Sequence, residues 1–295
     1  MERKKASDFP PEVMELFDGF VHGRITRRDF LDGAAGYAVG GFTAAAMLEA
    51  LTPNFAWAQQ VAKDDARIKS GYVEFDSPQG SGKMRGYLAR PAKEGKAPGV
   101  VVIHENRGLN PYIEDVARRL ATEGFVALAP DALSPSGGYP GDEDKGREAF
   151  SKLDPKKTFE DMSAAVPHLQ HRTECNGKVG VIGFCWGGGM VNQLAVRFAD
   201  LKAGVPFYGP TPSPDAAAKV KAAMQLHYAE KDDYVNKGRD PWVGALKKAG
   251  VKVEEYVYPG TQHGFHNDTT PRYDEKSAKL AWSRALAWFK TNLTT

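Results

Sequence analysis

The segment from Gly183 to Gly188, Gly-Phe-Cys-Trp-Gly-Gly, constrains the fold of this chain more than any other stretch. It follows residues 178–182, a short apolar run rich in β-branched residues, and it precedes residues 190–199, which predict a helix. Cys185 therefore lies at a strand-to-helix turn in a Gly-x-Cys-x-Gly frame. This is the nucleophile-elbow pattern with cysteine in place of serine.

The glycines on either side of Cys185 have a physical reason. A sharp turn forces the central residue into a strained backbone conformation, and the neighbours two residues away must be small for the backbone to close. The following helix directs the positive end of its dipole at the sulfur, which favours the thiolate. The alternative is a glycine-rich turn that carries a buried, inert cysteine.

Composition limits the class of protein. The chain has 295 residues, of which 42% are hydrophobic and 26% charged, as in globular proteins. A formal net charge of +2 gives no reason to expect a nucleic-acid partner. The only cysteines, Cys175 and Cys185, exclude a disulfide framework and show no zinc-binding spacing, so no metal is predicted. A single bond between them stays open, although it would disable the elbow.

The N-terminus resembles a twin-arginine export signal. Residues 26–31 read Thr-Arg-Arg-Asp-Phe-Leu, residues 33–48 form an uncharged run rich in alanine and glycine, and residues 56–58 read Ala-Trp-Ala, a cleavage-site pattern. We therefore expect residues 1–58 to be a cleaved signal region that engages the twin-arginine machinery, and residues 59–295 to be a single exported, periplasmic domain. The alternative is an amphipathic N-terminal helix that happens to contain Arg-Arg.

The remaining chain alternates predicted strands and helices. Residues 71–75 and 83–89 alternate apolar with polar or small residues and predict an antiparallel hairpin at a sheet edge. Residues 99–104 form a continuous apolar run, as expected of a strand buried on both faces. Repeated β–α alternation predicts an α/β fold with a mostly parallel sheet covered by helices on both faces. Residues 134–157, rich in glycine, proline and aspartate, are expected to be a surface excursion or a flap.

A nucleophilic cysteine needs a base, and the base needs an orienting group. In such sheets these groups lie in loops beyond the carboxyl ends of strands. One predicted loop contains Asp232 and Asp233, and a later one contains His263 and His266. The order nucleophile, acid, histidine is that of α/β-hydrolases. We take His263 as the candidate base with His266 second, and leave Asp232 and Asp233 as alternatives for the acid.

The other histidines have simpler interpretations. His22 lies in the predicted signal region, and His168 and His171 are three apart on a predicted helix, where a solvated face is expected. His227 lies inside a strand, where packing is expected. His104 precedes Glu105 at a strand end, a position that can line the site.

Taken together, the elbow, the Glu105 strand end, the Ala-Glu-Lys-Asp loop and the Gln-His-Gly-Phe-His-Asn loop resemble the dienelactone hydrolase (carboxymethylenebutenolidase) family. The resemblance extends from Tyr72 to Phe289. It implies an α/β-hydrolase fold and a triad of Cys185, His263 and Asp232. It also implies that Glu105 lies near the nucleophile and holds the thiol in the resting enzyme.

One departure concerns the substrate. In characterised dienelactone enzymes an arginine four residues after the triad histidine binds the substrate carboxylate, and here that position is Asn267. A second substrate arginine has only Arg147 as a candidate. Hydrolysis is therefore better supported than a dienelactone substrate.

The sequence thus predicts a thiol hydrolase of lactones or carboxylic esters. The backbone N–H of Trp186 and that of Asn106 are the expected oxyanion donors. No organic cofactor is implied. Two other classes remain: a non-catalytic scaffold that binds a small hydrophobic ligand, and a redox protein with Cys185 as a peroxide-sensitive thiol.

Overall fold

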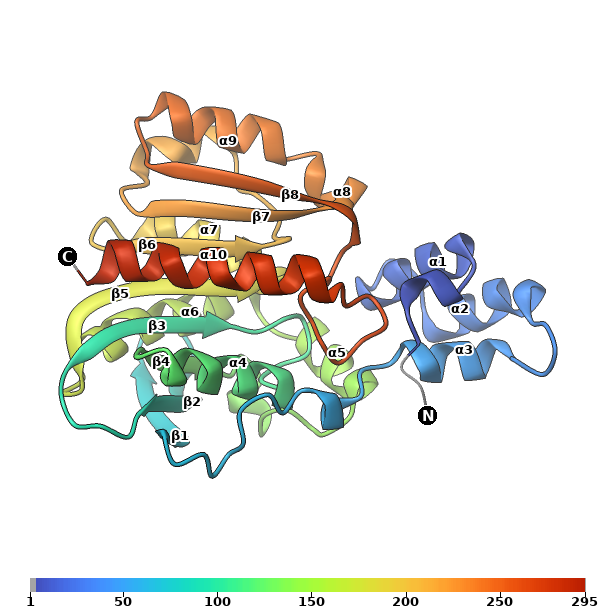
Figure 1. The fold of residues 1–295 in the computed structure, drawn as a ribbon, viewed down its shortest axis with the longest axis horizontal. Helices are drawn as coiled ribbons and strands as arrows, with labels where there is room; N and C mark the ends of the chain where they lie inside the picture. The colour runs from blue at the N-terminus through green and yellow to red at the C-terminus, as the bar shows by residue number, and fades with distance from the viewer. Residues whose placement is uncertain (1–3, 295) are drawn as a thin grey trace.

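A computed structural model describes residues 4–294 of the chain (Figure 1). The strands are β1 (Ile68–Ser77), β2 (Gly82–Pro91), β3 (Ala97–Ile103), β4 (Val126–Pro130), β5 (Cys175–Phe184), β6 (Ala203–Phe207), β7 (Ala223–Lys231) and β8 (Val253–Gln262). The α-helices are α1 (Pro11–Val21), α2 (Arg27–Ala34), α3 (Ala44–Leu51), α4 (Pro111–Thr122), α5 (Glu143–Ser151), α6 (Pro155–Gln170), α7 (Trp186–Arg197), α8 (Asp233–Asn236), α9 (Arg239–Lys248) and α10 (Glu275–Leu293).

One eight-stranded sheet forms the body of the molecule, in the order β1-β2-β4-β3-β5-β6-β7-β8. The hairpin β1–β2 is antiparallel and joins β4 in antiparallel fashion, whereas the strands from β4 to β8 run parallel. This confirms the predicted edge hairpin and the mostly parallel sheet of an α/β-hydrolase fold. The parallel strands end at one common edge, and that edge carries the site.

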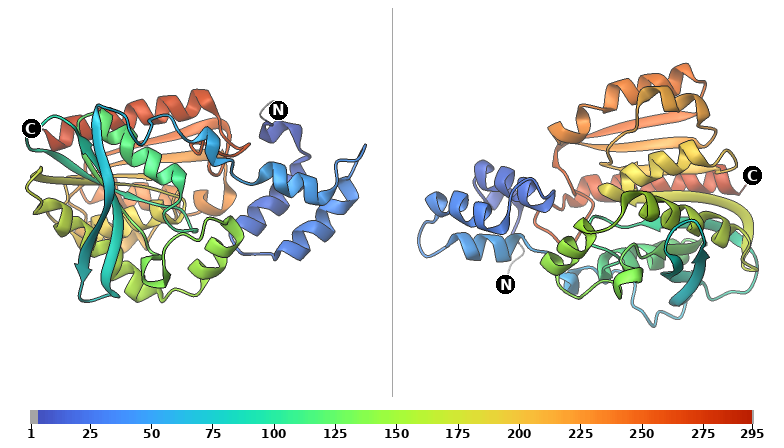
Figure 2. Two further views of the ribbon diagram at one scale, coloured as in Figure 1. Left: turned by 90° about the horizontal axis from the view of Figure 1, so that it is seen from below. Right: turned by 180° about the vertical axis from the view of Figure 1, so that it is seen from behind.

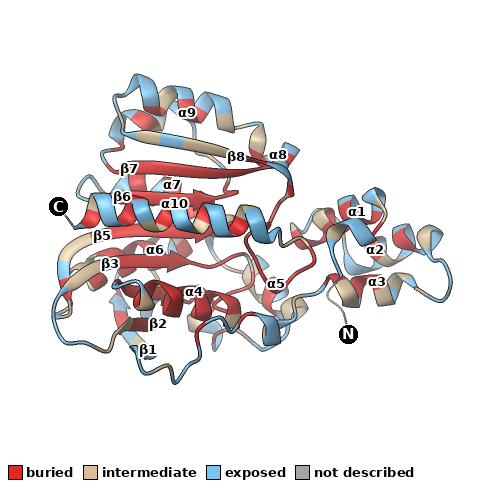
Figure 3. Ribbon diagram, viewed as in Figure 1, coloured by how far each residue is buried: buried red, intermediate tan, exposed pale blue. Residues whose placement is uncertain are grey.

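Strand β3 shows why the sheet needs helices on both faces. Val100 and Val102 pack into the cluster formed with α4 and α10, and Val101 and Ile103 pack into the cluster formed with α6, α7 and α9. All four side chains are fully buried, and most of β3 carries the colour of buried residues in Figure 3. Burying an aliphatic side chain contributes about 1.5–3 kcal/mol, so a continuous apolar run is stable only between two covered faces.

Residues 134–157 are less irregular than expected. They contain α5, which begins where the Asp142 side chain accepts a hydrogen bond from the Lys145 N–H at 2.8 Å. Glu143 and Asp144 add negative charge to the first turn of α5, where the helix dipole favours it. The segment is therefore a helix-bearing excursion, and α5 contacts the N-terminal part of the chain.

Residues 6–57, here called the N-terminal helical segment, form a small hydrophobic cluster of their own around α1, α2 and α3. Phe17, Phe20 and Phe30 contact one another at its centre. The uncharged run is interrupted, because a 3-10 turn at Ala35–Tyr37 and a glycine-containing turn separate α2 from α3. Among the described residues, no helix has the length and apolarity needed to span a membrane. Cleavage after residue 58 stays a prediction.

The N-terminal helical segment lies against the carboxyl edge of the parallel strands (Figures 1 and 2). Four hydrogen bonds with a backbone partner on the segment tie it there: Asn106 Nδ2 to Val21 O at 2.8 Å, Arg147 Nη1 to Phe20 O at 2.9 Å, Ala6 N to Pro271 O at 2.8 Å, and Asn54 N to Thr269 O at 2.8 Å. The segment therefore covers the region in which the sequence places the site.

Candidate active site

Cys185 occupies a strained turn between β5 and α7. Its backbone has φ 57° and ψ −119°, a conformation that non-glycine residues rarely adopt. A Cβ added at Gly183 would lie 2.3 Å from Gly187 O, and one added at Gly187 would lie 2.4 Å from Ile103 O. The elbow therefore needs glycine at both positions, which agrees with the sequence argument.

Trp186 is the first residue of α7, so its N–H belongs to the group of N-terminal amides with no acceptor inside the helix. The indole ring stacks on His104 with ring centroids 5.4 Å apart, and it packs edge-on against Phe150 at 4.8 Å. These contacts fix the first turn of α7 beside the Cys185 sulfur. An oxyanion contact of the Trp186 N–H stays a prediction.

His263 and Asp232 meet although 31 residues separate them. His263 Nδ1 lies 2.6 Å from Asp232 Oδ2, and both side chains are buried. Asp232 also accepts a hydrogen bond from the Val235 N–H at 3.3 Å, which holds the carboxylate in place. Asp233 is exposed as the first residue of α8, so the geometry favours Asp232 as the orienting acid.

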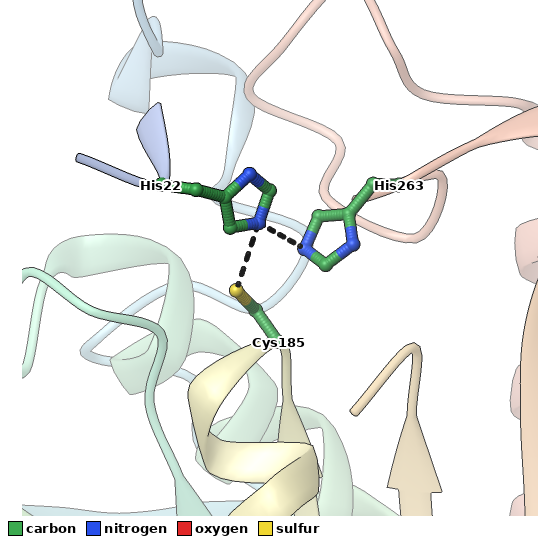
Figure 4. Close-up of side chains that lie close together, drawn as sticks. All are labelled: His22, Cys185 and His263. Atoms are coloured by element: carbon green, nitrogen blue, oxygen red, sulfur yellow. Dashed lines mark hydrogen bonds between the residues drawn. The ribbon is translucent and has the colours of Figure 1, made fainter. Parts of the chain in front are cut away.

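A third side chain lies between the nucleophile and the base (Figure 4). His22, from the residue that follows α1, has its Nε2 atom 3.8 Å from Cys185 Sγ and 3.2 Å from His263 Nε2. Within the described part of the chain, the Cys185 sulfur therefore contacts the His22 ring. The sequence analysis placed His22 in the predicted export signal and did not identify it as a site residue. The pattern that could have suggested it is the spacing of four between Asp18 and His22 on a helix.

Asp18 holds the His22 ring from behind. Nδ1 of His22 lies 2.8 Å from the Asp18 carbonyl oxygen and 3.2 Å from Asp18 Oδ1. Burial opposes ionisation of Asp18, but the hydrogen bond and charge of His22, with the charge of Arg272, lower its pKa well below the ordinary value. Burial and His263 lower the pKa of His22, yet hydrogen bonds with Asp18 and Cys185 outweigh them and raise it.

Glu105 is buried at the end of β3 and pairs with Asn267. Asn267 Nδ2 donates to Glu105 Oε2 at 3.0 Å, while Asn267 Oδ1 accepts from the Thr269 N–H at 3.0 Å. Asn267 occupies the position at which the family has its substrate-binding arginine. In this chain the Asn267 amide contacts the Glu105 carboxylate. A hydrogen bond from the Cys185 thiol to Glu105 stays a prediction.

The candidates Asn106 and Arg147 both contact the N-terminal helical segment. The Asn106 side chain binds Val21 O, as described above, so the loop that carries its backbone N–H is in place beside the segment. Arg147 stacks on the Phe20 ring, with its Cζ 3.7 Å from the ring centroid, and its Nη2 lies 3.3 Å from Asp144 Oδ1. Arg147 is therefore engaged with the segment in the full chain.

Three other histidines, His104, His227 and His266, are buried in the core. His266 Nδ1 lies 2.7 Å from Tyr112 Oη, and burial together with nearby Arg119 lowers its pKa well below the ordinary value. Burial likewise lowers the pKa of His227 to about 3. His104 accepts a hydrogen bond at Nε2 from the Ala132 N–H at 3.1 Å. These environments favour neutral, packed rings, whereas His263 contacts Asp232 and His22, and His22 in turn contacts Cys185.

Sequence reasoning also missed Arg272. Its Nη1 lies 3.6 Å from Asp18 Oδ1, and its guanidinium packs over Phe17, 5.3 Å from the ring centroid. The side chain is only 9% exposed, and among the described residues its Nε and Nη1 have no hydrogen-bond partner. No local sequence pattern indicated a role for Arg272, because Asp18 and Phe17, which contact it, lie near the other end of the sequence.

The two cysteines are free and buried. Cys175 lies at the start of β5 and Cys185 just beyond its end, so the length of the strand separates them. The disulfide that the sequence left open is therefore not formed.

The site can now be compared with known proteins. A model of the dienelactone hydrolase family matches residues 84–293. The chain belongs to the dienelactone hydrolase family. A second model, described as YqhI-like, matches residues 1–39, which include His22. Residues 84–293 and residues 1–39 thus match separate families. The part of the chain that follows residue 58 is here called the catalytic domain.

Individual relatives agree with the dienelactone hydrolase family. A putative hydrolase fragment, YghX of Escherichia coli, is 59% identical over 38% of this chain and 97% of its own length. A putative carboxymethylenebutenolidase of Salmonella typhi is 33% identical over 76% of this chain and 88% of its own. The crystal structure of a putative dienelactone hydrolase from Klebsiella pneumoniae superposes with a TM-score of 0.65 at 30% identity, covering 75% of this chain and 98% of its own.

Proposed function

We propose that the catalytic domain hydrolyses a lactone or carboxylic ester with Cys185 as nucleophile, His263 as base and Asp232 as the group that orients the base. The observation that carries this proposal is the 2.6 Å contact from His263 Nδ1 to Asp232, opposite a cysteine held at positive φ. Membership of a family of lactone and ester hydrolases supports the reaction class.

The proposed reaction has two halves. His263 Nε2 takes the proton of the Cys185 thiol, and the thiolate attacks the carbonyl carbon of the ester. The backbone N–H groups of Trp186 and Asn106 bind the oxyanion, and each donor of this kind contributes about 3 kcal/mol in the transition state. The tetrahedral intermediate expels the alkoxide, which takes the proton from His263. Water, deprotonated by His263, then hydrolyses the thioester and regenerates the thiol.

Catalysis by this route requires His22 to leave. With His22 Nε2 within 3.2 Å of His263 Nε2, the base cannot take the Cys185 proton directly. We therefore propose that the active form lacks the N-terminal helical segment, as cleavage after Ala58 would achieve. Export by the twin-arginine route belongs to this proposal. The side chains of Arg27 and Arg28 are 54% and 89% exposed and accessible to recognition.

Arg272 supports a substrate that carries a carboxylate. In the full chain its charge is matched by Asp18, which the N-terminal helical segment supplies. Removal of the segment takes away both Asp18 and the Phe17 ring that covers the guanidinium. An arginine that loses both its anion and its aromatic cover is free to form a charge-assisted hydrogen bond with a substrate carboxylate.

The deciding experiment is a panel of lactones and aryl esters tested on residues 59–295, with Cys185→Ala as the blank. Hydrolysis that disappears in the blank supports the proposal. No turnover of any ester, combined with failure of a thiol-directed ester analogue to label Cys185, would favour a ligand-binding scaffold. Sulfenic-acid trapping at low peroxide without ester turnover would favour a redox thiol.

A further inference from the structure

We propose that the full-length chain binds a zinc-class metal ion through His22 Nε2, Cys185 Sγ and His263 Nε2. This inference goes beyond hydrolysis and does not rest on it, because it concerns the resting chain with the N-terminal helical segment in place. The cysteine spacing in the sequence gave no reason to expect a metal. The third ligand becomes visible only once α1 docks on the catalytic domain.

The three ligand atoms are spaced as a small metal ion requires. Zinc binds imidazole nitrogen at about 2.0–2.1 Å and thiolate at about 2.3 Å, so tetrahedral ligands lie roughly 3.3–3.6 Å apart. The two histidine nitrogens are 3.2 Å apart, and His22 Nε2 is 3.8 Å from the sulfur. All three atoms lie within 4.8 Å of one another (Figure 4). Binding requires the Cys185 sulfur, which lies within 4.8 Å of His263 Nε2, to move closer to that atom.

Both imidazoles are oriented as metal-binding histidines usually are. A histidine ligand normally donates its other ring N–H to a carboxylate or a backbone carbonyl, which fixes the tautomer and makes the free nitrogen a better ligand. His263 donates from Nδ1 to Asp232 at 2.6 Å. His22 can donate from Nδ1 to Asp18, whose carbonyl oxygen lies at 2.8 Å. Each Nε2 atom is therefore left as a free ligand atom within 4.8 Å of the sulfur.

Charge and burial suit a divalent cation. The thiolate together with the carboxylates of Asp18 and Asp232 supplies three negative charges behind the ligands. Arg272, beside Asp18, offsets one of them. The Cys185 residue is 9% exposed and the side chains of His263 and His22 are 6% and 14% exposed, so the site is sheltered yet reachable by a fourth, solvent ligand. The donor set of two imidazoles and one thiolate suits zinc and cobalt better than magnesium or calcium.

The site joins two parts of the chain. Cys185 and His263 belong to the catalytic domain, whereas His22 belongs to the N-terminal helical segment, and two ligands alone bind a metal weakly. Metal binding would therefore hold the segment in its docked position, since any ion that binds only the docked form stabilises it. The same ion would occupy the thiol and shelter it from oxidants until the segment is removed.

The test uses full-length protein titrated with Co²⁺ and then with Zn²⁺. We expect one equivalent of cobalt to give a thiolate charge-transfer band and the intense visible bands of a tetrahedral site, and zinc to displace both. Cys185→Ser should abolish the charge-transfer band. His22→Ala and His22→Gln should each weaken cobalt binding by at least about 100-fold, and Asp18→Asn by about 10- to 100-fold. His171→Ala, which changes an exposed histidine whose ring hydrogen-bonds to the Pro167 carbonyl of its own helix, is the matched control.

A second readout follows the segment itself. Zinc should slow proteolytic release of residues 1–58 in the wild-type chain and in His171→Ala, but not in either His22 variant. Absence of one-equivalent cobalt binding in the wild type would overturn the proposal, and so would unchanged affinity in both His22 variants while circular dichroism shows them folded. No substrate enters these measurements, so their failure leaves the hydrolase proposal standing, and failure of the ester panel leaves the metal site standing.

Discussion

The rings of His22 and His263 meet edge to face, with centroids 4.5 Å apart and planes at 82°. Their Nε2 atoms are 3.2 Å apart, so the nitrogen with which His263 would deprotonate Cys185 is directed at another histidine. The proposed base is thus held by Asp232 yet separated from the proposed nucleophile. This arrangement is what a resting state requires: the groups are in place, and one side chain keeps them from acting together.

His22→Ala should raise the ester hydrolase activity of the full-length chain. The alanine variant loses the ring contacts with Cys185 and His263, each worth about 0.5–1.5 kcal/mol, so the docked segment should open about ten-fold more often. Initial rates on an aryl ester, compared for the wild type, His22→Ala and the control His171→Ala, measure the effect. If residues 59–295 and the full chain were equally active, His22 would not obstruct the site.

Cys185→Ala and His263→Ala should each lower kcat of residues 59–295 by several orders of magnitude, and the double variant should cost little more. Residues that act as one unit show this lack of additivity. Pre-steady-state kinetics on an activated ester should also lose the burst that reports the acyl-enzyme. Losses that multiplied in the double variant would show that the two side chains act independently.

Arg272→Met should raise KM for esters that carry a carboxylate while leaving neutral esters of the same size unaffected. A charge-assisted hydrogen bond of the kind expected here is worth about 1.5–3 kcal/mol, or roughly 10- to 100-fold in KM. The comparison is made in residues 59–295, where Asp18 is absent. Arg197→Met, which removes an arginine paired with Glu160 on α6, serves as the control. Equal losses for charged and neutral esters would point to a structural role.

The sequence predicted the parts of the fold that depend on local chemistry. The apolar run of β3 required two covered faces, and the glycines around Cys185 required a tight turn; both features are present. Helix α5 was missed because glycine, proline and aspartate around it suggested an excursion, although Asp142 followed by Glu143 and Asp144 was a helix-start signal.

The parts that the sequence did not predict depend on docking between distant segments. His22 lies 163 residues from Cys185, and its spacing of four from Asp18 does not by itself distinguish an active-site ring from a solvated one. Arg272 is similar, since its anion and its aromatic cover both come from α1. The amide of Asn267 contacts the Glu105 carboxylate, which the family resemblance implied would hold the thiol. Tertiary packing determines the partners of all three side chains.

Changing Arg27 and Arg28 together to lysine should retain the full-length precursor in the cytoplasm. The twin-arginine route recognises the guanidinium pair, and lysine keeps the charge without its shape. Arg27 pairs with Asp144 at 2.8 Å and Arg28 lies 3.7 Å from Asp32, both at the surface, so the double change should leave the fold intact. Cell fractionation with N-terminal sequencing is the measurement. A mature N-terminus near Gln59 in the periplasm from the lysine variant would rule out this route.

Glu105→Gln should make Cys185 alkylate faster with iodoacetamide near neutral pH. Glu105 is buried at the end of β3, and a carboxylate close to the sulfur disfavours the thiolate. Glutamine removes the charge and keeps the shape, and it can still accept the hydrogen bond that Asn267 donates at 3.0 Å. The experiment belongs in residues 59–295, because in the full chain His22 contacts the sulfur and would mask the effect.

Asn267→Ala is the companion variant for this test. It removes the amide that holds Glu105 while keeping the charge, so the carboxylate should be free to turn toward the thiol and slow alkylation. Opposite changes in the two variants would show that Glu105 governs the resting thiol. Equal alkylation rates in the wild type, Glu105→Gln and Asn267→Ala would instead mean that Glu105 only supports the end of β3.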